Sequence, residues 1–326
     1  MLPPVLQNLY LPLISAPMFT VSYPELVIEQ CRAGIVGAFP ALNARPAAQL
    51  DDWLTEIRER LQADRIKHAD AKQGPLAVNQ IIHPSNTRLA QDLQVCSDHH
   101  VPILITSLSA PPKELIDEVH RYGGIVLHDV INVRHARKAL AAGVDGLVLV
   151  AVGAGGHAGM LSPFALLAEV RAIFDGPLIL SGAIGTGSAI LAAQAMGSDM
   201  AYVGTRFIAT REAHASAGYK QALLDANAAD ITYTDVFTGI KGNYLNASIV
   251  AAGLDPAALL VSSVGLEGKT SKLENSDAKA WKDIWGAGQG VGSIDSILPL
   301  ADVVKQMGAE YDRAVASLAA RTSTKH

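Results

Sequence analysis

Short apolar runs alternate with stretches of helical period through the first two-thirds of the chain, and this alternation restricts the fold more than any other feature of the sequence. Some of the runs, such as residues 146–152, are apolar at nearly every position. A strand of this kind is covered on both faces, as in a parallel sheet with helices packed outside it. The alternation therefore predicts an α/β fold.

Strand–helix repeats are predicted up to about residue 212, and there are eight of them. The predicted strands are residues 13–16, 34–39, 75–80, 102–107, 124–130, 146–152, 177–181 and 200–205. The predicted helices between them are residues 23–33, 47–63, 86–99, 111–121, 133–142, 163–174 and 187–196. Eight repeats are the number that closes a (β/α)8 barrel. We expect that barrel, and an open doubly wound sheet is the alternative.

The strand series stops after Thr210, although helical stretches continue. A glycine-rich loop follows over residues 286–292, and residues 293–320 have helical period again. We therefore expect a barrel over residues 1–212 and a small helical insertion after strand eight, over residues 213–284. Residues 285–326 are then a tail that returns to the barrel through the glycine-rich loop and a C-terminal helix.

The charge balance and the cysteine content exclude several classes of protein. The net charge is −5, and Lys and Arg are scattered rather than gathered in the stripe that nucleic acid requires. Cys31 and Cys96 follow no metal-ligand spacing and favour a reducing, cytoplasmic compartment. The uncharged run over residues 176–198 is interrupted by proline and glycine, unlike a membrane helix. We expect a cytoplasmic protein that binds no nucleic acid, membrane or metal.

Glycine-rich turns follow two neighbouring predicted strands. Gly182, Gly185 and Gly187 come after strand seven, and Gly204 and Thr205 end strand eight. Loops at this position of a barrel often bind phosphate, because backbone N–H groups at a helix N-terminus attract an anion and glycine permits close approach. The alternative is that these glycines only form tight turns. With both loops together, the sequence favours a phosphate site.

His157 lies after the sixth predicted strand, in a loop with four glycines among seven residues. The carboxyl ends of barrel strands carry the catalytic groups. Imidazole changes charge near neutral pH and therefore suits general acid–base catalysis. The flanking glycines let a flat ligand approach the backbone. We expect His157 to be catalytic, and the alternative is a loop histidine held by a structural hydrogen bond.

Six short motifs occur in order along the chain. They are SAPM at residues 15–18, AVN at 77–79, GGHAG at 155–159, SGAI at 181–184, GTRF at 204–207 and AGQGVG at 287–292. Together they resemble the nitronate monooxygenase family, formerly called 2-nitropropane dioxygenases, over about residues 13–295. The resemblance implies a TIM barrel that binds FMN. Relatives with the same frame reduce enoyl-acyl-carrier-protein or quinones, so it implies a shared cofactor but not one substrate.

The resemblance also implies roles for individual residues. His157 matches the family's catalytic base, which takes the α-proton of a neutral nitroalkane. Pro17 and Met18 should lie against the flavin, and Asn79 should hydrogen-bond it. The remaining expected cofactor contacts are Gly155, Gly156, Ser181, Gly182, Ala183, Tyr202, Gly204 and Thr205, of which Gly182, Ala183, Gly204 and Thr205 hold the phosphate.

The sequence departs from the family at the fifth strand. Relatives often have Lys or Gln there, near the flavin pyrimidine, and this chain has His128 and Asp129. Because side chains alternate along a strand, only one of the two points inward. We predict His128 as the flavin contact, since its imidazole can donate a hydrogen bond to reduced flavin, whereas an ionised Asp129 would disfavour the anionic form. Asp129 is the alternative inward residue.

The expected activity is FMN-dependent oxidation of alkyl nitronates by O2 to carbonyl compounds and nitrite. One alternative keeps FMN but uses NAD(P)H to reduce quinones or enoyl-acyl-carrier-protein. Another is a barrel isomerase or lyase that binds a sugar phosphate without flavin. The expected partners are a small-molecule substrate and O2, and a homodimer is compatible with the sequence. Lys241, Asn243 and Tyr244 are candidate substrate contacts, with a surface-loop role as the alternative.

Overall fold

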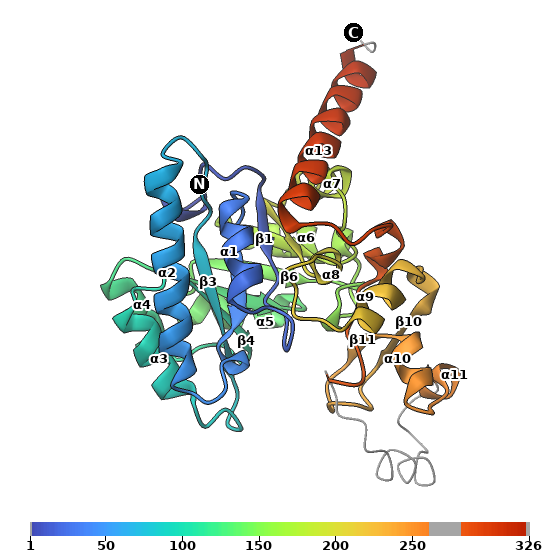
Figure 1. Cartoon of the computed structure of the whole chain (residues 1–326), viewed down its shortest axis with the longest axis horizontal. Helices are drawn as coiled ribbons and strands as arrows, with labels where there is room; N and C mark the ends of the chain where they lie inside the picture. The colour runs from blue at the N-terminus through green and yellow to red at the C-terminus, as the bar shows by residue number, and fades with distance from the viewer. Residues whose placement is uncertain (1, 261–281, 324–326) are drawn as a thin grey trace.

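Eight parallel strands form the centre of the molecule, and helices surround them (Figure 1). The structure is a computed structural model and describes residues 2–260 and 282–323. The barrel strands are β1 (Leu13–Ser15), β2 (Gly37–Pro40), β3 (Leu76–Ile82), β4 (Ile103–Leu108), β5 (Ile125–Val130), β6 (Gly146–Val150), β8 (Leu178–Ser181) and β9 (Met200–Val203). Each of them overlaps one of the predicted strands.

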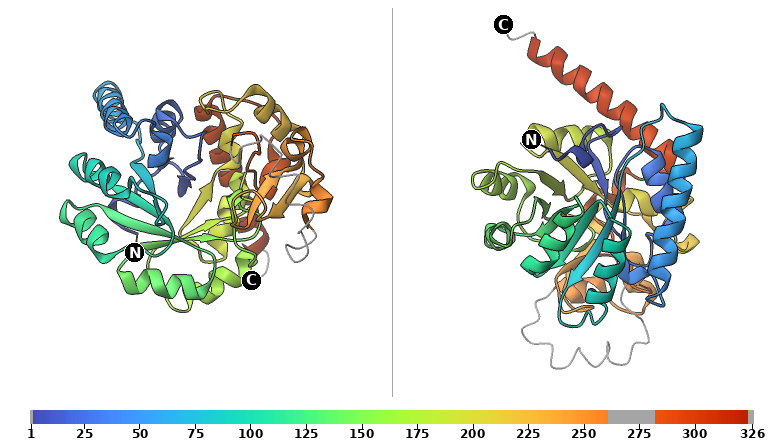
Figure 2. Two further views of the ribbon diagram at one scale, coloured as in Figure 1. Left: turned by 90° about the horizontal axis from the view of Figure 1, so that it is seen from below. Right: turned by 90° about the vertical axis from the view of Figure 1, so that its left-hand side faces the viewer.

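The strands follow one another around the ring in chain order (Figure 2, left). The ring is nearly closed. A parallel bridge joins Ile14 of β1 to Val36, which directly precedes β2. Beside it, the Ser15 N–H donates to the Val36 carbonyl at 2.9 Å. The predicted (β/α)8 barrel is confirmed, and the alternative of an open doubly wound sheet is wrong.

Helices alternate with the strands and cover the outside of the barrel. They are α1 (Pro24–Arg32), α2 (Gln49–Lys67), α3 (Leu89–Asp98), α4 (Lys113–Arg121), α5 (Val133–Ala142), α6 (Pro163–Arg171) and α7 (Gly187–Ala195). The Asn132 side chain caps α5 by accepting from the His135 N–H, and Thr186 caps α7 in the same way. Gly143 ends α5 in a left-handed conformation, with φ 102°, that glycine adopts without strain.

Apolar side chains fill both the inside of the barrel and the layer between strands and helices. Ile14, Ile105, Leu127, Val148 and Ile179 are fully buried in the inner cluster. A second buried cluster joins the outer faces of the strands to the surrounding helices. Because both faces are packed, polar groups gather where the strands end, and the loops there build the site.

The chain after β9 forms short helices and a hairpin. The helices are α8 (Thr205–Ile208), α9 (Ala217–Leu224), α10 (Asn246–Ala251) and α11 (Pro256–Leu260). The strands β10 (Ile231–Thr234) and β11 (Gly242–Leu245) pair antiparallel. The strand β11 also pairs with β7 (Gly156–His157), which belongs to the loop after β6. We call residues 231–245 the cap hairpin.

The predicted helical insertion over residues 213–284 is not confirmed, because its described part contains these two strands as well as helices. The two strands of the cap hairpin have four residues each, so their alternation is too brief to distinguish from a loop in the sequence. Their partner β7 is distant in the chain, and pairing across such a distance leaves no local signal. Residues 261–281 of the predicted insertion lie outside the described residues.

The last helix, α13 (Leu300–Ser323), begins later than the predicted residue 293, because a 3-10 turn precedes it at Gln289–Ser293. It packs on α7, where the Gly187 N–H donates to the Glu310 carboxylate at 2.8 Å. Its C-terminal half extends away from the barrel (Figure 2, right). Over residues 2–260 and 282–323, no helix combines the length and the apolar run needed to cross a membrane.

Candidate active site

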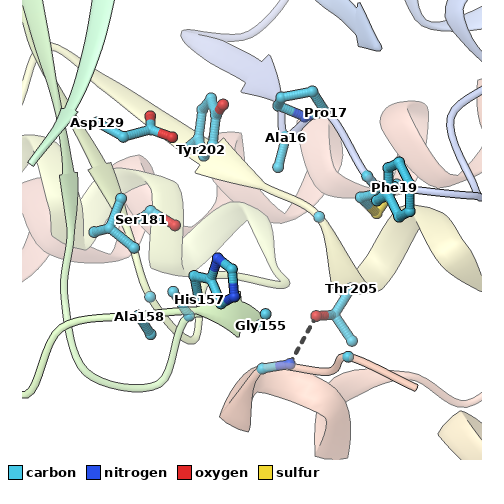
Figure 3. A pocket seen from close by; sticks show the side chains of 18 of the residues that line it. Ala16, Pro17, Phe19, Asp129, Gly155, His157, Ala158, Ser181, Tyr202 and Thr205 are labelled. Atoms are coloured by element: carbon cyan, nitrogen blue, oxygen red, sulfur yellow. Dashed lines mark hydrogen bonds between the residues drawn. The ribbon is translucent and has the colours of Figure 1, made fainter. Parts of the chain in front are cut away.

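A cavity of about 560 Å³ lies at the carboxyl ends of the barrel strands (Figure 3). Its lining comes from the ends of β1, β3, β4, β5, β8 and β9, from the loop after β6, from the cap hairpin, and from the glycine-rich loop at residues 286–290. This end of a (β/α)8 barrel is where substrates and cofactors bind. The volume is within the range of small-molecule sites, about 300–1,000 Å³. This cavity is the candidate active site.

Three loops meet at one end of the cavity and are joined by hydrogen bonds. The Gly153 carbonyl accepts from the Ala183 N–H at 3.2 Å and from the Gln289 N–H at 2.9 Å. The Gly288 N–H donates to the Thr205 hydroxyl oxygen at 2.9 Å, the dashed line in Figure 3. Because Thr205 accepts this bond, its own O–H can donate into the cavity.

Close packing of these loops explains their glycines. Gly182 has φ 133°, and a Cβ at this position would lie 2.8 Å from the Val152 carbonyl oxygen. Ala183 has φ 54°, a left-handed conformation that costs a non-glycine residue about 1 kcal/mol. The turns are thus required for packing. Ala183 is one of the residues that the resemblance assigns to the phosphate, and its N–H already donates to the Gly153 carbonyl.

Arg206 brings a positive charge to the cavity lining. It lies on α8 directly after Thr205 and is only 4 % exposed. Burial lowers the pKa of its guanidinium, while Asp295 and Glu310 act in the opposite direction. The sequence analysis includes Arg206 in the GTRF motif but predicts no role for it. The guanidinium donates to the Ser296 carbonyl at 3.5 Å, so it is the glycine loops and the Thr205 hydroxyl that make this end of the cavity suitable for an anion.

A series of polar side chains lies at the other end of the cavity. The Asn79 amide donates to the Ser107 hydroxyl at 2.8 Å, and Ser107 donates to the Asp129 carboxyl at 2.6 Å. The second Asp129 oxygen and the Tyr202 hydroxyl are buried and have no hydrogen-bond partner in the described part of the chain. Burial raises the pKa of Asp129 to about 7 against the effect of the Ser107 bond. Such groups beside a cavity are suited to hydrogen-bond a ligand.

His128 does not line the cavity. Its ring hydrogen-bonds the Thr106 hydroxyl at 2.8 Å, and burial lowers its pKa to about 4. Adjacent side chains of a strand point to opposite faces, so His128 faces the helix layer while Asp129 faces the cavity. The inward residue of β5 is therefore Asp129, and His128 is removed from the candidate site.

His157 lies on β7 and is held by the cap hairpin. It pairs with Gly242 in the ladder between β7 and β11. Its ring nitrogen Nε2 lies 3.0 Å from the Thr238 hydroxyl oxygen. Figure 3 shows the ring between the polar end of the cavity and Thr205. Burial lowers the pKa of His157, which keeps the imidazole neutral at neutral pH and able to accept a proton.

The structure brings the predicted site residues together, with the exception of His128. The predicted residues that line this cavity are Pro17, Met18, Asn79, Gly155, Gly156, His157, Ser181, Gly182, Ala183, Tyr202, Gly204 and Thr205. Sequence reasoning missed Asn43, whose amide donates to the Met18 carbonyl at 3.0 Å and holds that loop. It also missed Thr238. Neither residue belongs to a motif, so only the fold reveals them.

Lys241, Asn243 and Tyr244 do not line the cavity. The buried Asn243 amide donates to the Ala154 carbonyl at 2.6 Å and so supports the glycine loop beside His157. Tyr244 is fully buried and packs edge-on against Phe237. Their positions favour structural support of the hairpin over contact with substrate.

Comparison with known proteins identifies the family. A profile described as nitronate monooxygenase matches residues 6–310. The chain belongs to the nitronate monooxygenase family. A nitronate monooxygenase of Paraburkholderia phytofirmans is 30 % identical to it, with 94 % of each chain covered. A nitronate monooxygenase of Neurospora crassa is 25 % identical, over 91 % of this chain and 88 % of its own.

Solved structures have the same fold. Nitroalkane oxidase from Streptomyces ansochromogenes aligns with a TM-score of 0.72 at 27 % identity, over 95 % of this chain and 98 % of its own. FabK from Thermotoga maritima aligns with a TM-score of 0.80 at 23 % identity, over 97 % of each chain. Nitronate monooxygenases are flavin-dependent, so family membership makes this protein an oxidoreductase with a flavin cofactor.

Proposed function

We propose that the protein is an FMN-dependent nitronate monooxygenase, which oxidises alkyl nitronates with O2 to carbonyl compounds and nitrite. The observation that carries the proposal is the position of His157 in a barrel-end cavity. Glycine loops lie at one end of this cavity, and polar groups without a partner among the described residues lie at the other. The relative from Paraburkholderia phytofirmans has this name, and the Streptomyces protein is called a nitroalkane oxidase.

The lining of the cavity fits FMN. The second Asp129 oxygen and the Tyr202 hydroxyl, which have no hydrogen-bond partner in the described part of the chain, suit the donors and acceptors of the flavin pyrimidine. The Thr205 hydroxyl and the glycine loops beside it suit its phosphate. Met18 offers apolar contact to the ring. When bound, FMN supplies the acceptor for the substrate's electrons, which pass to O2.

His157 would act as a general base on a neutral nitroalkane. Such a substrate must lose its α-proton, and a buried neutral imidazole has a lone pair to take it. A nitronate has already lost this proton, so its oxidation depends on His157 much less. Pairing with the cap hairpin leaves His157 half-buried, and burial strengthens the electrostatic interactions around its ring.

The proposal extends to the division of the chain. Residues 1–212 would form the FMN-binding barrel, residues 213–284 a cap over the substrate, and residues 285–326 a tail that returns to the barrel. Gly286, Gly288 and Gly290 of the tail line the cavity beside Ile240 of the cap hairpin, which supports this division. A cytoplasmic location and a homodimer stay predictions.

The test is turnover with defined products. FMN-loaded protein is mixed in air with a pre-formed alkyl nitronate, and nitrite, carbonyl product and O2 uptake are measured. We expect all three to appear in a fixed ratio. Absence of nitrite, together with NAD(P)H-driven reduction of a quinone or an enoyl thioester, would establish the reductase alternative instead. Protein that takes up no flavin would exclude both.

A further inference from the structure

We infer that Thr238 positions His157 and fixes its neutral tautomer, so that Nδ1 is the nitrogen that takes the substrate proton. The inference rests on the proposed role of His157 as a base. Thr238 lies in the loop between β10 and β11, within the cap hairpin, and its hydroxyl oxygen is 3.0 Å from His157 Nε2. Thr238 does not line the cavity, so it is a positioning residue.

The neighbours of the Thr238 hydroxyl decide where its single proton goes. Its oxygen lies 3.0 Å from the Ile240 carbonyl oxygen and 3.0 Å from His157 Nε2. A carbonyl oxygen can only accept a hydrogen bond. If the Thr238 proton pointed elsewhere, two oxygens would face each other at 3.0 Å without a hydrogen between them. The proton therefore lies toward Ile240, and Thr238 offers His157 a lone pair.

A lone pair facing Nε2 requires a proton on Nε2. The neutral imidazole carries one N–H proton, so its acceptor lone pair is then on Nδ1. Longer contacts of 3.4 Å join the Thr238 oxygen to the Ile240 N–H and to the Tyr244 hydroxyl. One of these two groups can donate to the remaining lone pair of Thr238. The hydroxyl then makes three hydrogen bonds, one as donor and two as acceptor.

The arrangement also has a consequence for pH. An acceptor at Nε2 stabilises the charged imidazolium more than the neutral ring. Loss of the Thr238 hydroxyl should therefore lower the pKa of His157 below its already reduced value. Tyr244 of the cap hairpin is linked to the His157 ring only indirectly, because its hydroxyl lies 3.4 Å from the Thr238 hydroxyl oxygen. The other titratable side chains that share the cavity with His157 are Asp129 on β5, His135 on α5, Tyr202 on β9, Arg206 on α8 and Tyr219 on α9.

The tautomer can be read directly by proton–nitrogen correlation NMR. The protein is labelled with nitrogen-15 histidine, with and without bound FMN, and the His157 signals are assigned by their loss in His157→Gln. We expect the proton on Nε2 in the native protein and a mixture of tautomers in Thr238→Val. A native spectrum with the proton on Nδ1 would overturn the inference, whatever the protein's activity.

Kinetics supply the second test. Thr238→Val should lower kcat/KM for a neutral nitroalkane about five- to tenfold, the equivalent of one hydrogen bond. It should shift the acid limb of the pH profile to lower pH and leave pre-formed nitronate unaffected. Thr238→Ser should restore both. Thr232→Val is the matched control, because Thr232 lies in the same hairpin and donates to Asn246 of α10, at 2.6 Å.

An equal loss for nitroalkane and nitronate in Thr238→Val would mean that Thr238 only supports the fold, and would overturn the inference. Loss of activity in the Thr232→Val control to the same extent would do so as well. If the native protein oxidises neither substrate, the proposed function fails, and the NMR result alone then decides the tautomer.

Discussion

The barrel and the cap hairpin contribute to the same cavity in different ways. The barrel is built from consecutive strand–helix repeats around an apolar interior, and it provides the walls. The cap hairpin is built from two four-residue strands, and it holds the ring of His157 through Thr238. We therefore expect barrel substitutions to change stability and hairpin substitutions to change catalysis. Substitutions in each region test that separation.

The largest expected effect is on catalysis. His157→Ala should lower turnover of neutral nitroalkanes by about 10²–10⁴-fold, the usual contribution of a general base. It should retain bound FMN and most activity on pre-formed nitronate, because that substrate needs no base. The comparison requires steady-state rates on both substrates together with the flavin content. Unchanged turnover of the neutral nitroalkane would remove His157 from the mechanism.

A barrel substitution should act on stability instead. Leu127 is fully buried inside the barrel, and Leu127→Ala should lower the free energy of unfolding by about 2–5 kcal/mol. Thr238→Val, in the hairpin, should lower it by about 1 kcal/mol at most. Denaturant unfolding of both variants makes the comparison. Equal destabilisation by the two would show that barrel and hairpin are not separable in this way.

Asp129 should make stability depend on pH. Burial raises its pKa to about 7 in the folded protein, so near pH 5 the folded chain holds a proton that the unfolded chain has released. The free energy of unfolding therefore falls as pH rises from about 4 to about 7, and it is level above that. Asp129→Asn should remove this fall, which is on the order of 4 kcal/mol.

The measurement is the thermal unfolding of flavin-free protein on both sides of neutral pH. Asp117→Asn is the control, because Asp117 is exposed and bonded only to Lys113 among the contacts described. The same pH dependence in Asp129→Asn as in the native protein would contradict the assignment of Asp129 as the titrating group.

The smallest expected effect concerns Ala183. Its left-handed backbone is strained, and Ala183→Gly should relieve about 1 kcal/mol of strain while adding freedom to the unfolded chain, for a net gain of about 0.5 kcal/mol. Ala154→Gly, at a nearby position without a positive φ, should be destabilising. Denaturant midpoints of the two variants provide the comparison, and a loss of stability in Ala183→Gly would contradict the strain.

The sequence predicted the barrel because its signals are local. Each strand and helix has its own periodicity, and runs such as that of β6 reveal burial on both faces. The same double burial explains the error at β5. Val126 and Leu127 are both apolar and both buried, so the sequence does not show which residues of β5 point into the barrel. Only the closed barrel shows that Asp129, and not His128, points inward.

The candidate site was predictable where glycine and histidine mark a loop, as around His157 and Gly182. It was not predictable where a residue acts through tertiary contact. Asn43 holds the Met18 loop and Thr238 holds His157, and neither position differs in its local sequence from an ordinary loop residue. The short strand β11 depends likewise on its distant partner β7.

The most direct test of the proposed function is anaerobic reduction of the bound flavin. FMN-loaded protein is mixed without O2 with a pre-formed alkyl nitronate, and separately with NADH and with NADPH, while the flavin absorbance is followed. We predict rapid bleaching by the nitronate and none by either nicotinamide. Rapid bleaching by NADH or NADPH, with none by the nitronate, would contradict the assignment.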